Sequence, residues 1–112
     1  MDKGTNKIIS DYIASVAKLN TQLVKAYLFG SYAKRTDRID SDIDVALIID
    51  NLKDDEKFDI QVQLMLLASN FDMRIEPHPI SNKDFNSGNP FANEIKSTGI
   101  EIEPRTPNAW YV

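Results

Sequence analysis

One short run of residues constrains the fold of this chain more than any other feature of the sequence. Residues 43–49 read IDVALII, and every one of them except Asp44 is apolar. A strand with one solvated face alternates polar and apolar side chains, whereas a nearly continuous apolar run is typical of a strand covered on both faces. The run Leu23–Phe29 has the same character and ends at Gly30. The chain is therefore expected to place a small, buried sheet between other elements.

Apolar residues at helical spacing predict the elements that cover this sheet. Residues 7–19 carry one apolar stripe, for which Thr5 or Asn6 is the expected N-terminal cap. Residues 54–70 read as a second long helix, with Phe58, Val62, Met65 and Leu66 as its apolar stripe and Ile60, Leu64 and Leu67 widening that stripe. A short helix over 91–98 is expected to stop at Gly99. The order of the elements indicates an α/β fold.

A third strand is predicted over residues 71–80, where side chains alternate. Phe71, Met73 and Ile75 fall on one side, and Asp72, Arg74, Glu76 and His78 fall on the other. Proline cannot donate a hydrogen bond to a neighbouring strand, so Pro77 and Pro79 favour a place at the edge of the sheet. A last extended piece is expected over 100–103, followed by a tail over 104–112.

Length and composition exclude several classes of function. With 112 residues the chain has room for one compact domain. The absence of cysteine excludes disulfides, thiol catalysis and cysteine-ligated metals, and the lone His78 excludes histidine-rich sites. No apolar run has the length of a membrane span. A sequence pI of about 4.9 argues against a general nucleic-acid binder. We expect a small cytoplasmic domain whose chemistry uses carboxylates, hydroxyls and backbone groups.

Two aspartates at the start of the apolar run are the main candidates for that chemistry. Residues two apart on a strand point to the same side, about 6–7 Å apart, so Asp42 and Asp44 aim two carboxylates at one point. A divalent cation such as Mg²⁺ removes their repulsion. Gly30 and Ser31 offer the close backbone approach and the donors that a phosphate needs.

Each of these signals also has an ordinary structural interpretation. The two aspartates could form the solvated start of a strand, and a Gly-Ser pair is often only a turn. Three basic residues of the next loop, Lys34, Arg35 and Arg38, are equally consistent with phosphate contacts and with solvated charges. Glu76 could pair with Arg74, and a lone histidine such as His78 is structural by default.

The spacing of these residues matches a known signature. Gly30-Ser31, ten intervening residues and Asp42-Ile43-Asp44 form the pattern G-S-x10-D-x-D between two apolar strands. The pattern resembles that of the nucleotidyltransferase superfamily, which includes the beta-type DNA polymerases. In length the chain resembles the minimal nucleotidyltransferases (MNT), and the resemblance covers residues 7–102. It implies a single small nucleotidyltransferase domain over 1–103, with a short mixed sheet flanked by about four helices.

The resemblance also implies roles for individual residues. Asp42, Asp44 and a third acid on the strand 71–80 would be catalytic and hold one or two Mg²⁺ ions; Glu76 is favoured as that acid, with Asp72 as the alternative. Gly30, Ser31, Lys34 and Arg35 would bind the nucleotide, most simply ATP. The implied reaction is transfer of a nucleoside monophosphate to a hydroxyl.

The resemblance also suggests which molecule accepts the nucleoside monophosphate. Minimal nucleotidyltransferases are commonly paired with HEPN-type proteins, so the resemblance suggests an antitoxin that transfers AMP to a tyrosine of a HEPN-type toxin. The alternative is a nucleotidyltransferase-fold binding module with little catalysis, which neutralises or scaffolds a partner. A polymerase or tailing enzyme is disfavoured by the acidity. The aromatic tail, Trp110 and Tyr111, leaves a homo-oligomer and a hetero-complex both open.

Overall fold

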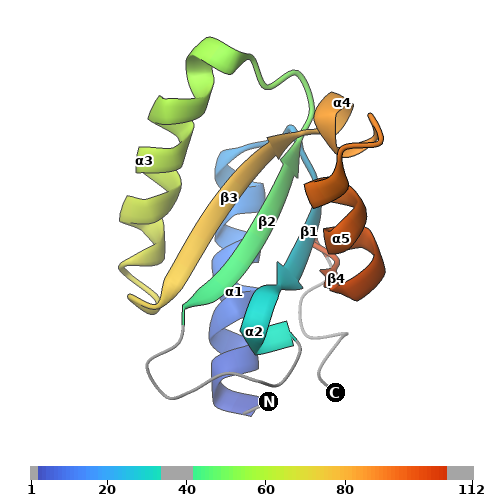
Figure 1. Cartoon of the computed structure of the whole chain (residues 1–112). Coiled ribbons are helices and arrows are strands. Elements are labelled where there is room, and N and C mark those ends of the chain that lie inside the picture. Colours follow the sequence, from blue (N-terminus) through green and yellow to red (C-terminus); the bar gives the residue numbers. More distant parts are fainter. Residues whose placement is uncertain (1–2, 34–41, 106–112) are drawn as a thin grey trace.

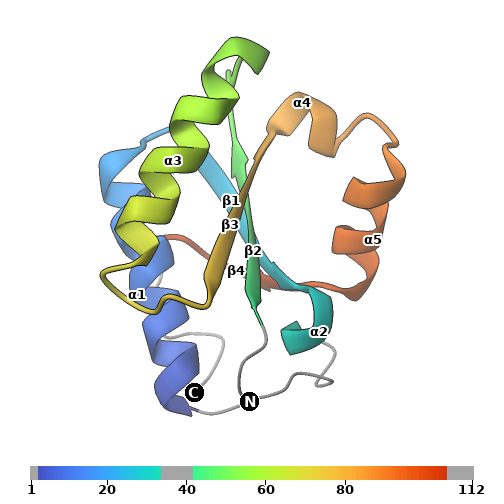
Figure 2. The ribbon, with the colours of Figure 1, turned by 60° about the vertical axis from the view of Figure 1, so that its left-hand side comes forward.

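The computed structural model describes residues 3–33 and 42–105, which form a four-stranded mixed sheet with helices on both faces (Figures 1 and 2). The strands are β1 (Leu23–Phe29), β2 (Ile43–Ile49), β3 (Ile75–Ser81) and β4 (Ile100–Ile102). The helices are α1 (Lys3–Leu19), α2 (Gly30–Ala33), α3 (Lys57–Ala68), α4 (Asn82–Phe85) and α5 (Pro90–Thr98), with a 3-10 turn η1 (Asp54–Glu56) before α3. The predicted α/β class and mixed sheet are confirmed.

The sheet separates two apolar cores. Figure 2 views the sheet nearly edge-on, with α1 and α3 on one side and α4 and α5 on the other. Odd-numbered residues of β2, such as Val45 and Leu47, belong to the core under α1 and α3, whereas Ala46 and Ile48 belong to the core under α4 and α5. Each fully buried aliphatic side chain of this size contributes about 1.5–3 kcal/mol. The continuous apolar run of β2 therefore reflects burial on both faces, as predicted.

The strand order β3-β2-β1-β4 places the acidic start of β2 beside two other strand ends. β1 is antiparallel to β2, and β3 is parallel to it. Phe29, the last residue of β1, is therefore opposite Asp44, and Asp44 is in turn opposite Glu76 of β3. One end of the sheet thus gathers the turn after β1 and the first residues of β2 and β3.

β3 is an edge strand, as its two prolines predict. It pairs with β2 alone among the described strands. The side chain of Gln61 in α3 donates to the carbonyl oxygen of Pro77 at 2.6 Å, so a helix side chain satisfies a backbone group that lies on the strand. This contact and the prolines leave fewer open backbone groups on the edge.

Two predictions about helices are wrong. α1 begins at Lys3, so Thr5 and Asn6 lie inside the helix and are buried there instead of capping it. In α3 the face toward the sheet holds the buried Leu64 and Ala68. The predicted stripe is exposed: Phe58 76%, Val62 39%, Met65 51% and Leu66 66%.

The physical reason is that α3 is apolar on both faces, so helical spacing alone does not choose between them. Contacts with α1 determine which face of α3 is buried. The hydroxyl of Tyr12 in α1 donates to the carbonyl oxygen of Leu64 at 2.9 Å in a buried hydrogen bond. We call the four exposed residues Phe58, Val62, Met65 and Leu66 the outer face of α3.

The described part of the chain continues past β4 to Arg105. The guanidinium of Arg105 donates to the carbonyl oxygen of Leu23 at 2.6 Å and to that of Thr21 at 3.4 Å, which holds this segment against the start of β1. The boundary between a domain over 1–103 and a tail over 104–112 stays a prediction. Among the described helices, none combines the length and apolarity that crossing a membrane requires.

Candidate functional site

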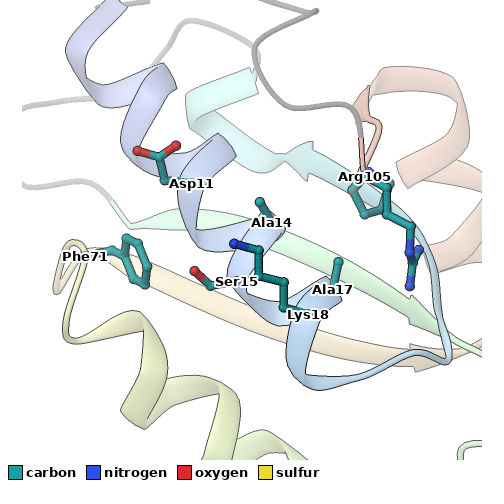
Figure 3. Close-up of a pocket in the computed structure, with 8 residues that line it drawn as sticks. Asp11, Ala14, Ser15, Ala17, Lys18, Phe71 and Arg105 are labelled. Carbon is teal, nitrogen blue, oxygen red and sulfur yellow. The ribbon is translucent and has the colours of Figure 1, made fainter.

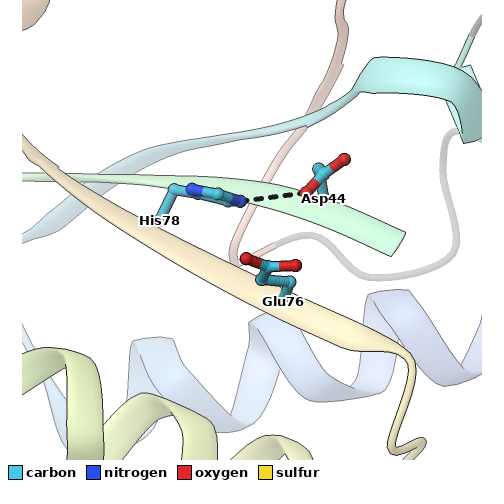
Figure 4. A group of neighbouring side chains, drawn as sticks. All are labelled: Asp44, Glu76 and His78. Atoms are coloured by element: carbon cyan, nitrogen blue, oxygen red, sulfur yellow. Dashed lines mark hydrogen bonds and ion pairs between the residues drawn. The ribbon is translucent and has the colours of Figure 1, made fainter. Parts of the chain in front are cut away.

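Two carboxylates face each other across β2 and β3. Asp44 is the second residue of β2, and Glu76 is the second residue of β3, with which it is in register. The alternation of β2 puts Asp44 on the same side as Ala46 and Ile48, the side covered by α4 and α5. Figure 4 shows the two carboxylates projecting toward one another from neighbouring strands. The predicted juxtaposition of the G-S turn, β2 and the third strand is therefore present.

His78 joins these acids, which the sequence did not lead us to expect. Its Nε2 lies 3.0 Å from Oδ1 of Asp44 (Figure 4). Ligand atoms of Asp44, Glu76 and His78 all lie within 4.8 Å of one another. The signal was available in the sequence, because His78 is two residues after Glu76 on a strand and shares its face. A lone histidine in a sequence is more often structural, so the spacing alone does not identify His78 as a member of the site.

Gly30 provides the space that Asp44 occupies. Its φ is +77°, a conformation that L side chains rarely adopt. A Cβ at Gly30 would lie 2.6 Å from Oδ2 of Asp44, so any larger residue would displace this carboxylate. Glycine is therefore favoured twice, by the turn from β1 into α2 and by the carboxylate beside it. Ser31 follows in the first turn of α2 and is half-buried.

The acids at this end of the sheet act on one another electrostatically. The pKa of Glu76 is raised by burial, by a hydrogen bond with Asp42 and by the negative charges of Asp42 and Asp44, whereas His78 acts in the opposite direction. Asp42 itself is exposed, just before β2. The structure thus brings Asp42, Asp44 and Glu76 together, with His78 as a fourth member.

The donor set fits a divalent cation. Carboxylates crowded in this way either share a proton or need an external positive charge. Asp44, Glu76 and His78 offer two oxygen donors and one nitrogen donor within a small, half-buried volume. Divalent ions in proteins are held by such groups, with oxygen preferred by Mg²⁺ and nitrogen accepted by first-row transition metals. The residues present therefore fit a divalent cation.

Asp72 lies in different surroundings. The strand predicted over 71–80 is wrong for its first four residues, since Asp72 lies in the turn between α3 and β3. Its carboxylate accepts from the backbone N–H of Arg74 at 2.9 Å and pairs with the Arg74 guanidinium at 2.9 Å. These local hydrogen bonds favour a turn over an extended strand. They also hold the pKa of Asp72 below its ordinary value.

Three basic residues of the sequence prediction lie outside the described residues: Lys34 and Arg35, predicted to bind nucleotide, and Arg38. The aromatic residues Trp110 and Tyr111 likewise lie outside them. Roles for these residues stay predictions.

A pocket of about 620 Å³ lies away from the acids. Its walls are α1, Phe71 and the segment of Pro104 and Arg105. Figure 3 shows the side chains of Asp11 and Lys18 on α1, with Phe71 and Arg105 on either side of the helix. The pocket belongs to the α1 side of the molecule, whereas Asp44 points to the opposite face of the sheet. It contributes nothing to the carboxylate site.

Comparisons with known proteins agree with this geometry. Residues 11–106 match the family described as Polymerase beta, Nucleotidyltransferase. Among curated proteins none matches the sequence. A crystal structure from Sulfolobus solfataricus, of a protein assigned as a nucleotidyltransferase, has a TM-score of 0.57 and 20% identity over 88% of this chain and 77% of that one. A toxin–antitoxin structure with AMP-PNP has a TM-score of 0.57 and 24% identity over 82% and 70%. At these identities the two structures show that the chain shares their fold.

Proposed function

The chain belongs to the Polymerase beta, Nucleotidyltransferase family, and from this premise we propose that it transfers a nucleoside monophosphate, AMP from ATP, to a hydroxyl group. One observation carries the proposal. Asp44 and Glu76 face each other from adjacent strands, directly beside the turn at Gly30. Carboxylates next to a glycine turn are what a triphosphate bound with a divalent ion requires.

Each residue of the site has a task in binding. Asp42, Asp44 and Glu76 would hold the cation, for which Mg²⁺ is the expectation from the sequence. When bound, the cation supplies positive charge that neutralises the triphosphate and favours attack at its α-phosphorus. The backbone at Gly30 and the hydroxyl of Ser31 would bind the terminal phosphates, and Lys34 and Arg35, which follow in the sequence, would add positive charge.

The chain's own groups can also handle the proton of the acceptor. In the proposed transfer, the hydroxyl oxygen forms a bond to the α-phosphorus, and the bond from that phosphorus to the bridging oxygen breaks. Pyrophosphate leaves with the electron pair, and the hydroxyl proton passes to the carboxylate oxygen of Glu76 that does not bind the cation. A carboxylate that is within reach of the hydroxyl is a suitable general base.

We propose a HEPN-type toxin as the partner that carries the hydroxyl, on a tyrosine, which makes the chain the antitoxin. The related fold in a toxin–antitoxin structure with AMP-PNP supports this proposal. The outer face of α3 supports a protein acceptor too, because exposed apolar patches rimmed by polar residues are typical of interaction sites. The net charge of −4 also favours a protein acceptor over a nucleic-acid strand.

Labelled ATP tests the reaction. The chain is incubated with Mg²⁺, a HEPN-type partner and ATP labelled on the α-phosphate or, in parallel, on the γ-phosphate. Label on a partner tyrosine from α-labelled ATP alone supports AMP transfer. Asp44→Asn should abolish labelling, while Asp72→Asn, the matched control outside the site, should retain it. Full labelling by Asp44→Asn would contradict the proposed role.

The second candidate function is a binding module with little catalysis. The outer face of α3 favours it, since this face could bind a partner without any help from the carboxylates. Replacing Phe58 and Leu66 by serine should then abolish complex formation, and Asp44→Asn should leave both binding and neutralisation intact. Neutralisation that is lost in Asp44→Asn, with binding retained, would favour the enzyme.

A further inference from the structure

His78 is the one histidine of the chain, and it lies among the carboxylates that we propose to bind a cation. We propose that the imidazole of His78 is itself a ligand of that cation, together with Asp44 and Glu76. The centre would then prefer a first-row transition ion such as Mn²⁺ over Mg²⁺. This inference rests on the proposed function, since it assigns the chemistry of the same cation site.

The first support is the separation of the donor atoms. Nε2 of His78 and Oδ1 of Asp44 are 3.0 Å apart. Two neighbouring ligands of an octahedral ion, each about 2.1 Å from the metal and at right angles, are also about 3.0 Å apart. The oxygen of Glu76 lies within 4.8 Å of both. The Nε2 and Oδ1 atoms are thus already at the spacing of a coordination shell, and the Glu76 carboxylate lies close enough to join them.

The second support is the rigid position of the ring. His78 lies between Pro77 and Pro79, whose fixed φ angles limit the motion of the backbone at this edge strand. Its ring makes a T-shaped contact with that of Phe29, with centroids 5.1 Å apart, and Phe29 packs in turn against Phe91 at 5.6 Å. Because the ring is already held on the same side as Glu76, it would lose little conformational entropy on binding a metal ion.

The third support is the chemistry of the donors. Mg²⁺ is hard and is normally bound by oxygen, while an imidazole nitrogen suits first-row transition ions. Two carboxylates with one imidazole therefore form a mixed set that Mn²⁺ accepts well. Replacing the nitrogen by an oxygen should shift the preference back toward Mg²⁺. His78→Gln makes this exchange, because the glutamine amide oxygen can reach the position of Nε2.

Pulsed electron paramagnetic resonance of bound Mn²⁺ tests the assignment without reference to activity. The protein is prepared without a polyhistidine tag, so His78 is the single source of an imidazole signal. We expect a nitrogen hyperfine coupling to Mn²⁺ in the native protein and its loss in His78→Gln. We also expect Mn²⁺ affinity to fall about tenfold or more in His78→Gln, with a smaller change for Mg²⁺ measured by displacement of Mn²⁺.

The controls separate this inference from the proposed function. Asp44→Asn should abolish Mn²⁺ binding, and Asp72→Asn should leave it unchanged. Mn²⁺ that binds through Asp44 without nitrogen coupling would overturn the role of His78 alone, and so would an unchanged ratio of Mn²⁺ to Mg²⁺ affinity in His78→Gln. Mn²⁺ binding that survives Asp44→Asn would overturn the cation site itself.

Discussion

Asp72 and Glu76 are close in sequence but lie in opposite electrostatic surroundings. The carboxylate of Asp72 accepts hydrogen bonds from the guanidinium and the backbone of Arg74, and its pKa is lowered. Glu76 lies against Asp42 and Asp44, and its pKa is raised. The negative charge of Asp72 is thus compensated by Arg74 in the same turn, whereas Glu76 lies beside other carboxylates.

The difference indicates which carboxylate is available for chemistry. An acid whose charge is already paired has little free energy to gain from a cation or a substrate. An acid that faces other acids is unfavourable alone and gains most when a cation binds. The surroundings, more than the residue type, therefore mark Glu76 as the candidate third acid.

The largest expected effect is on activity. Glu76→Gln keeps the size of the side chain and removes the charge, so transfer of label to the partner should fall about 10²–10⁴-fold, the range for loss of a general base. Asp72→Asn should change the rate far less, because Asp72 lies in a separate turn. The measurement is the initial rate of labelling from α-labelled ATP, with circular dichroism to verify folding. Equal losses in the two variants would remove the distinction between the acids.

The next largest expected effect is on the free energy of unfolding, when Gly30 beside the acidic site is replaced. Gly30→Ala must place a Cβ against Asp44, whereas Gly88→Ala, with φ of +86°, meets nothing within 4 Å. Both variants bear the cost of a left-handed alanine, about 1–2 kcal/mol. Gly30→Ala should cost about 1–3 kcal/mol more, because it also overpacks the site. Urea unfolding measures the difference, and equal free energies would show that Asp44 does not constrain this position.

The smallest effect is on stability in acid. The lowered pKa of Asp72 means that its charged form stabilises the folded state. This contribution is complete above the ordinary pKa of about 3.9 and is lost as the pH falls through the lower pKa of the folded state. Asp72→Asn should therefore cost about 1 kcal/mol at neutral pH.

The cost of Asp72→Asn should vanish in strong acid, where the native carboxyl is also neutral. Urea unfolding of both proteins from neutral pH down to about pH 2 measures this change. Asp55→Asn, at an exposed acid of η1, is the control. A cost for Asp72→Asn that does not depend on pH would show that its charge is not what holds the turn.

Much of the fold could be predicted because its signals are local. The runs at 23–29 and 43–49 are strands with the predicted bounds, and Gly99 follows α5 as expected. The side of α3 that packs was not predictable, since both sides are apolar and the choice depends on contacts with α1, which are distant in sequence. The turn at Asp72 differs from the predicted strand for a local reason, because the backbone N–H of Arg74, two residues on, donates to the Asp72 carboxylate and competes with the strand.

The members of the candidate site that could be predicted are those that residue spacing in the sequence identifies. Asp42 and Asp44 follow from the G-S-x10-D-x-D pattern, and Glu76 follows from the alternation of the third strand. His78 did not, although it shares that alternation, because its value depends on the contact with Asp44 across two strands. The requirement for glycine at Gly30 also depends on a partner distant in sequence, the carboxylate of Asp44.

Anomalous diffraction tests the central claim most directly, that the acids of β2 and β3 form a cation and nucleotide centre. Crystals of the chain would be grown with Mn²⁺ and an ATP analogue that cannot be cleaved between the α- and β-phosphates. We predict an anomalous peak between the carboxylates of Asp44 and Glu76, with the triphosphate at Gly30 and Ser31. A peak elsewhere, or nucleotide bound away from these carboxylates, would contradict the account.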